Sequence, residues 1–429
     1  MTATDTNSGG VQQIFTLYQT RNPTMTDFNE IKKHCEANSR ISSQVIDQFL
    51  IYYAAEKGHL VPQMEDQLRR YSQVARNLDP KYVNFLKSEF IAHRIFKKGG
   101  LIHKFLNHSA IKELPQNQKE FLSEQSKMPW RYSVASIVNN PSKAFFDMED
   151  AFTGDEYMLY SEGMQATENE KHSNLWFNLI GFNGKCWQTF GLLIPFSSFS
   201  VDDLFFFATE LNPSIIDEIS LAEEIENKPF PFFMLLNYSS TPAIISRNHE
   251  MIYCFSEDVL SDFNSEALRK DFNVIWDQNV YRFKFKSGDG MPHFATIYYD
   301  EIRKILTRTS MTEEGFRLLT DALNKAGYEL DFFSDIAVSQ AMITATKNIL
   351  HSKFNFEPYP ELFTETPGAE ESLRLKKYND FMKLLLPYQN EGKDFDLQAL
   401  ADKAGLDLET ARSLWKAAKE SADRMKKGY

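Results

Sequence analysis

The chain has 429 residues, of which 42% are hydrophobic and 25% charged, and its formal net charge is −12. A single hydrophobic core rarely serves a chain of this length, so we expect several modules. The negative charge disfavours general coating of nucleic acid, although a local basic patch could still bind phosphate.

The cysteines Cys35, Cys186 and Cys254 are far apart in the sequence and include no C-x-x-C pair. This spacing predicts neither a disulfide framework nor a zinc site, and it suits a reducing compartment. No apolar stretch reaches the roughly 18 residues of a membrane span. Residues 1–10 lack the basic and apolar segments of a signal peptide and are predicted to be a disordered tail. We therefore expect a cytoplasmic protein without membrane contact and without a cofactor.

Residues 11–129 have the pattern of a helical domain. Asp27 and Glu30 form a capping box, and Asp79 before Pro80 is a typical helix start. The pair Gly99-Gly100 breaks the helix that follows. We find no fixed repeat period in this domain.

The pattern changes at Trp130, after which aromatic-rich runs alternate with turn signals, as in antiparallel strands. The clearest hairpin joins residues 175–182 to residues 185–193 through Asn183-Gly184. This pair favours a type I′ turn, in which both central residues have positive φ. Two further hairpins are predicted, one from 145–150 and 157–161 around Thr153-Gly154-Asp155, the other from 280–286 and 293–299 around residues 287–290.

The order of these elements suggests that an α+β domain of residues 130–350 contains an internal duplication. One copy would cover residues 131–212 and the other residues 231–325. In this alignment residues 232–238 are a strand and residues 300–306 a helix. Two unrelated meanders are the alternative, and the sequence does not decide between them.

The remaining segments are an acidic helix at 215–227, a semi-extended linker at 351–368 and a small helical module at 369–429. The linker is predicted from Pro358, Pro360 and Pro367. The fold class is therefore α+β, with a helical N-terminal domain, a central antiparallel-sheet α+β domain and a small C-terminal helical module.

Sequence signatures of catalysis are missing: there is no P-loop, dinucleotide-binding glycine motif, nucleophile elbow or H-E-x-x-H. Catalytic residues therefore stay unknown. A weak candidate for a metal or acid–base site is the set Asp147, Glu149 and Asp150. Strand alternation places the first two on one face and Asp150 on the other. Ordinary surface carboxylates on a hairpin are the alternative interpretation, and the one that we favour.

Basic residues concentrate between Lys87 and Lys112, where six lysines or arginines accompany a single acidic residue. Within this segment we identify a candidate patch for an anion or nucleic acid, formed by Arg94, Lys97, Lys98 and Lys104. The alternatives are a solvated helix face, or a patch that the acidic helix at 215–227 neutralises.

Residues 397–414 resemble a helix-turn-helix, with the small residue Ala401, the turn glycine Gly405 and the apolar Leu406 and Leu414. Its second helix begins with an acidic segment at 407–409, which would repel the phosphates of DNA. The pattern is also similar to ubiquitin-associated folds, small modules that bind proteins. On one face further along that helix we find Arg412, Lys416 and Lys419, the candidate partner-binding residues.

These features favour a non-catalytic intracellular adaptor or regulatory protein that binds macromolecular partners, proteins foremost, through its central sheet domain and terminal helical modules. One alternative is nucleic-acid or ribonucleoprotein binding through residues 87–112 and the last helix. Another is a hydrolase-type enzyme with a carboxylate or metal site between Asp147 and Glu156.

Overall fold

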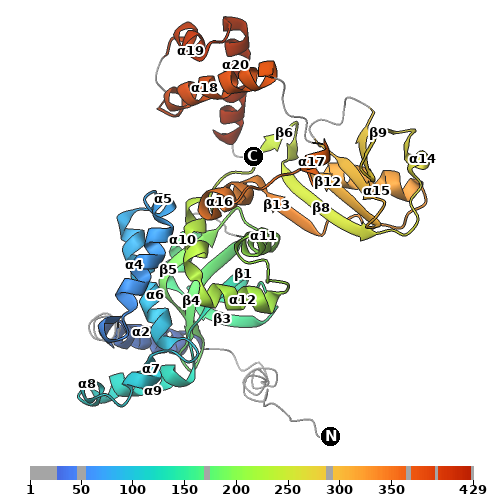
Figure 1. The fold of residues 1–429 in the computed structure, drawn as a ribbon. Coiled ribbons are helices and arrows are strands. Elements are labelled where there is room, and N and C mark those ends of the chain that lie inside the picture. The colour runs from blue at the N-terminus through green and yellow to red at the C-terminus, as the bar shows by residue number, and fades with distance from the viewer. Residues whose placement is uncertain are drawn as a thin grey trace, which may run out of the picture. The chain divides into compact units, whose positions relative to one another are not determined.

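The computed structural model describes residues 27–45, 55–168, 174–286, 293–363, 369–391 and 395–426 (Figure 1). It is 49% helical and 23% strand, with helices before and after central sheets, which confirms the α+β class. The chain divides into two compact units. The first contains Met1–Ala243 and Ile336–Ser352, and the second contains Ile244–Asp335 and Lys353–Tyr429. The predicted tail at 1–10 lies outside the described residues.

The first unit begins with helices whose starts follow the predicted caps. Asp27 Oδ1 accepts hydrogen bonds from the backbone of Asn29 and Glu30, and Asp79 Oδ1 accepts one from Lys81 N. Gly99, with φ of 69°, follows the helix that starts at Pro80, as predicted. The helices are α2 (Phe28–Val45), α4 (Leu60–Arg70), α5 (Ser72–Ala75), α6 (Pro80–Phe96), α7 (Ile102–Phe105), α8 (Ser109–Lys112) and α9 (Gln116–Lys127). They belong to the same compact unit as the barrel that follows them, whereas the sequence suggested a separate domain at 11–129.

A closed β-barrel forms the centre of the first unit, with strand order β1-β2-β3-β5-β4. Neighbouring strands are antiparallel except for the parallel pair β3–β5. Its strands are β1 (Arg131–Ser142), β2 (Phe145–Asp150), β3 (Glu156–Tyr160), β4 (Leu175–Phe182) and β5 (Trp187–Phe196), with α10 (Glu162–Glu168) between β3 and β4. This is the Greek-key topology of an OB-fold. The pairs β2–β3 and β4–β5 confirm two of the predicted hairpins.

The loop between β4 and β5 differs from the predicted type I′ turn. Gly184 has φ of 90°, but Asn183 is not in the left-handed region. Instead, Asn183 Oδ1 accepts hydrogen bonds from Lys185 N (2.8 Å) and Cys186 N (2.9 Å). An asparagine side chain can close a turn in this way without positive φ at its own position. The loop therefore runs on through Cys186, and β5 begins at Trp187.

Further helices pack outside the barrel, and the first and third of them are rich in phenylalanine. They are α11 (Val201–Leu211), α12 (Glu218–Asn227) and α13 (Pro229–Met234), followed by η2 (Leu235–Asn237). The strand predicted at 232–238 is therefore wrong. Pro229 occupies the first turn of α13, which a helix tolerates, and every residue of this short helix is buried. Such a run has no alternation to distinguish it from a buried strand. The unit is completed by β13 (Ile336–Ser339) and α16 (Gln340–Leu350), where Ser339 N donates to Asp203 Oδ1 of α11.

The strands of the second unit lie next to one another in the order β8-β12-β11-β10-β9, and all of these pairs are antiparallel. They are β8 (Ile252–Val259), β9 (Phe272–Asp277), β10 (Val280–Phe285), β11 (Thr296–Asp300) and β12 (Ile305–Ser310), preceded by the short pair β6 (Ile245–Ser246) and β7 (His249–Glu250). The strands β10 and β11 confirm the third predicted hairpin, whose turn at 287–290 lies outside the described residues. Helices α14 (Ser265–Leu268) and α15 (Glu313–Lys325) belong to the same unit.

The helix predicted at 300–306 is also wrong. Asp300 Oδ1 accepts hydrogen bonds from Ile302 N and Arg303 N, which turns the chain, and β12 begins at Ile305. The alignment behind the proposed duplication thus pairs a strand with helix α13 at one end and a helix with a strand at the other. A closed barrel and an open antiparallel sheet are also different topologies.

Part of the predicted linker at 351–368 is packed in the structure. The short helix α17 (Pro360–Phe363) and Tyr359 lie against Val280 and Tyr298 of the sheet. Tyr298 Oη donates to Glu357 Oε2 at 2.7 Å. Residues 364–368 lie outside the described residues.

The C-terminal bundle consists of α18 (Ala369–Glu391), α19 (Leu397–Ala404) and α20 (Leu408–Lys426). Its own core contains Phe381, Leu385, Leu400 and Ala401. Gly405 has φ of 66° and ends α19, as the resemblance to a helix-turn-helix implied. Among the described residues, no helix is both long enough and apolar enough for a membrane span.

Candidate functional site

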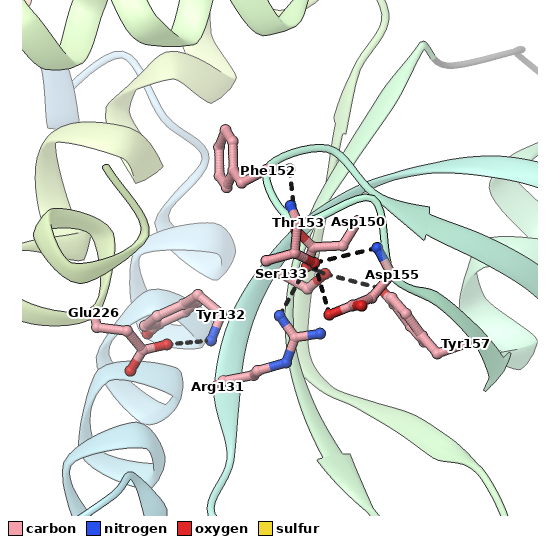
Figure 2. Close-up of polar contacts among 9 residues, drawn as sticks. All are labelled: Arg131, Tyr132, Ser133, Asp150, Phe152, Thr153, Asp155, Tyr157 and Glu226. Atoms are coloured by element: carbon pink, nitrogen blue, oxygen red, sulfur yellow. Dashed lines mark hydrogen bonds and ion pairs between the residues drawn. The ribbon is translucent and has the colours of Figure 1, made fainter. Parts of the chain in front are cut away.

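Asp150, a candidate metal ligand in the sequence, is the centre of a polar network at one end of the barrel (Figure 2). Its Oδ2 accepts hydrogen bonds from Arg131 Nη1 (2.8 Å) and Ser133 Oγ (3.2 Å). Its Oδ1 accepts hydrogen bonds from the backbone of Phe152 (3.1 Å) and Thr153 (3.3 Å). Both oxygens are therefore occupied, and the carboxylate fixes the turn between β2 and β3.

The network continues to Tyr157, whose hydroxyl lies 2.8 Å from Ser133 Oγ. Burial raises the pKa of Tyr157 to about 12, so this hydroxyl keeps its proton. Because Ser133 gives its only proton to Asp150, Tyr157 is the donor in this pair. The guanidinium of Arg131 lies over the rings of Tyr157 and Trp187, at 5.7 and 5.4 Å from their centroids. Each donor has an acceptor, which is the arrangement of a structural clamp.

The other two carboxylates of this set do not meet Asp150. The burial of β2 alternates as predicted, with Asp147 and Glu149 on the outer face and Asp150 inside the barrel. Asp147 Oδ2 accepts a hydrogen bond from Asn139 Nδ2 at 3.1 Å, and Glu149 is paired in register with Glu156. In the part of the chain that the structure describes, no group of three or more His, Cys, Asp or Glu residues could hold a metal.

Helix α2 covers the rest of the outer face of β2 and β3. The rings of Phe28 and Phe145 lie 5.0 Å apart, and Cys35 packs into the same buried cluster as Tyr160. In OB-folds this face and the adjoining loops bind oligonucleotides or oligosaccharides. Here it consists of a helix-covered part and of acidic residues, which repel a phosphate backbone.

The predicted basic patch is divided between contacts within the unit and solvent. Arg94 Nη2 donates to Asn227 O at the end of α12 (2.7 Å), and its guanidinium lies over the ring of Phe90. Burial lowers the pKa of Arg94 and that of Lys97. Lys98 and Lys104, in contrast, are exposed. Arg94 therefore packs against the end of the acidic helix through a backbone carbonyl, and neutralisation of the patch by that helix stays a prediction.

A buried polar cluster between α6, β1, β5 and α12 had no signal in the sequence. His93 Nε2 lies 2.6 Å from Glu226 Oε2, while Glu226 Oε1 accepts a hydrogen bond from Tyr132 N at 2.6 Å. Burial lowers the pKa of His93, so the neutral ring donates from Nε2 and leaves Nδ1 buried without a partner. Nearby, Glu89 Oε2 accepts a hydrogen bond from Leu192 N at 2.7 Å, and burial raises the pKa of Glu89 to about 8.

This buried cluster joins helices to the barrel. Gly191 of β5 has φ of 83°, and a Cβ atom there would lie 2.7 Å from Glu89 Oε2. The glycine thus lets α6 approach the strand closely enough for its carboxyl group to reach the backbone. The side chains of Glu89 and His93 are sealed from solvent, so a substrate cannot reach them without separation of the helices from the barrel.

A hollow of about 720 Å³ lies elsewhere in the first unit. Ile91 of α6 contributes to its wall, together with residues around α4, and its remaining lining residues are Ala55, Glu56, Lys57, His59, Val61 and Pro62. The candidate residues from the sequence do not line it.

The candidate residues of the C-terminal bundle lie on α20, after its acidic first turn. Asp407 Oδ1 accepts a hydrogen bond from Thr410 N at 2.8 Å, so this aspartate is the helix cap. Arg412, Lys416 and Lys419 follow at helical spacing and are exposed, and the ammonium of Lys419 lies 5.5 Å from the ring centroid of Trp415. We call these three residues the basic row of α20.

Comparison with known proteins yields no relative: no family model, no curated protein and no solved structure matches the chain. The likeness of the barrel to OB-folds therefore rests on topology, and topology does not fix function.

Proposed function

We propose that this protein is a non-catalytic adaptor of the cytoplasm that binds an acidic protein surface through the basic row of α20. The observation that carries the proposal is the contrast among its charged candidates. Asp150 is buried in the barrel, and Arg94 is partly buried beside α12. The basic row is exposed on a bundle that has its own core, which is the setting of a docking module.

Two features support a protein partner over DNA. The cap Asp407 and the nearby Glu409 place negative charge at the start of α20, where a recognition helix would enter the major groove. The chain also carries a net charge of −12, which slows its approach to nucleic acid because nucleic acid is a polyanion. The basic row can bind a local acidic patch on a protein without the long-range repulsion that a phosphate backbone would cause.

The test compares the full-length protein with a triple variant, Arg412→Glu, Lys416→Glu and Lys419→Glu. Partners co-purified from the source cells after nuclease treatment are identified by mass spectrometry and then tested pairwise by calorimetry. The matched control is Lys376→Glu, Lys383→Glu and Lys403→Glu, which makes the same charge change at exposed positions of the same bundle.

We expect a partner whose affinity falls at least about 10-fold in the α20 variant and little in the control, with a dependence on salt. A partner that is retained equally by both variants contradicts the proposal. So does the recovery of nuclease-sensitive material alone.

A second candidate function is binding of single-stranded nucleic acid by a surface other than the helix-covered and acidic outer face of β2 and β3. The exposed Lys98 and Lys104 are the residues that would then contact phosphate. Fluorescence anisotropy with a labelled oligonucleotide at low salt tests this function. Binding that weakens when both lysines are changed to glutamate supports it, and unchanged affinity argues against it.

A further inference from the structure

Two of the cysteines that the sequence separates are brought together by the fold. Cys35 on α2 and Cys186 in the β4–β5 loop are 151 positions apart, yet their Sγ atoms lie 3.4 Å from each other. Both are free thiols and both are buried. The amide of Asn183 donates to Cys35 Sγ at 3.2 Å and to Cys186 Sγ at 3.6 Å, which holds the two sulfurs side by side.

We propose that Cys35 and Cys186 are a redox modification site, which a small disulfide such as oxidised glutathione converts into an intramolecular disulfide. A disulfide needs a sulfur–sulfur distance of about 2.05 Å, so the two sulfurs must approach by only about 1.4 Å. One sulfur is on a helix and the other in a loop, and a loop can supply that movement by a small change of its backbone.

The surroundings of the pair determine which sulfur reacts first. The hydrogen bond from Cys186 lowers the pKa of Cys35, despite its burial. The same hydrogen bond, together with burial, raises the pKa of Cys186. Cys35 is therefore the sulfur that loses its proton more readily, and as a thiolate it acts as the nucleophile.

The reaction consists of two thiol–disulfide exchanges. The Cys35 thiolate attacks one sulfur of oxidised glutathione, forms a mixed disulfide and expels one glutathione thiolate. Cys186, after losing its proton, attacks Cys35 Sγ, forms the protein disulfide and expels the second glutathione thiolate. The two cysteines are oxidised, one glutathione disulfide is reduced, and the two protons from the cysteines end on the two glutathione molecules.

Access to the pair requires α2 to move away from the barrel. Contacts that hold it there are the hydrogen bond between His34 Nε2 and Asn183 O (2.8 Å) and the one from Asn38 Nδ2 to Gln188 Oε1 (2.8 Å). Local opening of these contacts therefore limits the rate of oxidation. Once formed, the disulfide would tie α2 to the barrel and keep the outer face of β2 and β3 covered.

Cys254 is an internal control. It lies in β8 of the second unit, and burial raises its pKa to about 11. A thiol with this pKa is almost fully protonated at pH 7 and exchanges slowly. Oxidation by oxidised glutathione should therefore be selective for the pair Cys35–Cys186.

The test uses the full-length protein in mixtures of oxidised and reduced glutathione, with peptide mapping by mass spectrometry under non-reducing conditions. We expect a linked peptide that contains Cys35 and Cys186, with two hydrogen atoms lost, while Cys254 remains a thiol. Free thiols at both positions, glutathione adducts without a link between them, or a link to Cys254 would each overturn the proposal. This readout on the wild-type chain does not depend on the folding of a variant.

A second measurement examines the tie between α2 and the barrel. Oxidation should raise the melting temperature of the first unit by on the order of 10 °C, because the disulfide closes a long loop. Cys254→Ser should keep this increase and Cys186→Ser should abolish it. A mapped link without any increase, or without slower hydrogen exchange in α2, would refute the tie.

Discussion

The barrel of the first unit and the sheet of the second unit differ in whether a strand is left at an open edge. The barrel closes on itself through β1 and β4 and so leaves no strand edge. In the second unit β9 ends the sheet, and its Ile275 and Trp276 are 48% and 55% exposed. Closure therefore protects the barrel, whereas the sheet depends on the side chains of its edge to avoid pairing with other chains.

The same two regions also differ in the way they bury charge. Each contains an arginine–aspartate pair. In the barrel the aspartate is the buried partner, with Asp150 3% and Arg131 33% exposed. In the sheet the arginine is buried, with Arg308 2% and Asp258 28% exposed. The buried partner is the one whose desolvation must be offset, so the two pairs should respond differently to loss of the carboxylate.

The largest loss of stability is expected for Asp150→Ala. The substitution leaves the Arg131 guanidinium and the turn amides of Phe152 and Thr153 without their acceptor, and the free energy of unfolding should fall by about 3–4 kcal/mol. Urea denaturation measures this loss, and hydrogen exchange of β1 and β2 locates it. Glu149→Ala, on the exposed outer face of β2, is the control and should cost less than about 0.5 kcal/mol. Equal effects would contradict the clamp.

Glu89→Gln should instead raise the stability, by an amount that depends on pH. Burial raises the pKa of Glu89 from 4.5 to about 8, so the folded protein binds this proton more tightly than the unfolded chain does. The free energy of unfolding of the wild type should therefore fall as the pH rises from 4.5 to about 8, and it should stay low above that pH. Glutamine carries no such proton, so at pH 9 the variant should be more stable than wild type by up to about 5 kcal/mol.

Thermal unfolding at pH 5 and at pH 9 tests this expectation. The two proteins should be nearly equal in stability at pH 5, where Glu89 is protonated in the folded state. A variant that is less stable than wild type at both pH values would mean that the carboxyl group is charged in the folded protein.

In the sheet, Asp258→Asn should cost only about 1–2 kcal/mol. Arg308 keeps its hydrogen bonds to Thr320 Oγ1 (2.6 Å) and Asp331 O (2.8 Å), so its guanidinium is not left isolated. Denaturation followed by hydrogen exchange in β8 and β12 measures the loss. A cost equal to that of Asp150→Ala would remove the distinction between the two pairs.

The sequence predicted those parts of the fold that local signals determine. Asp79 before Pro80 predicted the start of α6, and the turn around Gly154 predicted the β2–β3 hairpin. It failed at residues 232–238, because successive buried phenylalanines have no period that separates strand from helix. It also missed the tight turn at Gln278-Asn279, where both residues have positive φ but neither is glycine.

The contacts that define the sites could not be predicted, because they join distant segments. Alternation put Asp150 on the face opposite Asp147, but it could not show that Arg131 of the neighbouring strand β1 meets it. The pair His93–Glu226 spans 133 positions, and the cysteine pair spans 151. Such contacts depend on the packing of helices against the barrel, for which one sequence holds no local signal.

The smallest effect on stability concerns the exposed edge of the sheet. Ile275→Lys should change the free energy of unfolding by less than about 0.5 kcal/mol, because the side chain is already half exposed. It should nevertheless reduce aggregation on mild heating, measured by light scattering, since a charge on an edge strand opposes pairing with a second chain.

Leu318→Lys is the matched control, because Leu318 is 39% exposed and lies on helix α15 of the same unit, and a helix has no strand edge. A lysine there removes a similar apolar surface without altering a free edge, so aggregation should stay as in the wild type. If both variants suppress aggregation equally, exposed apolar area alone governs it, and the open edge of β9 has no special part. If only Ile275→Lys does so, the strand edge itself is the cause, and closure of the barrel is the reason that the first unit needs no comparable charge.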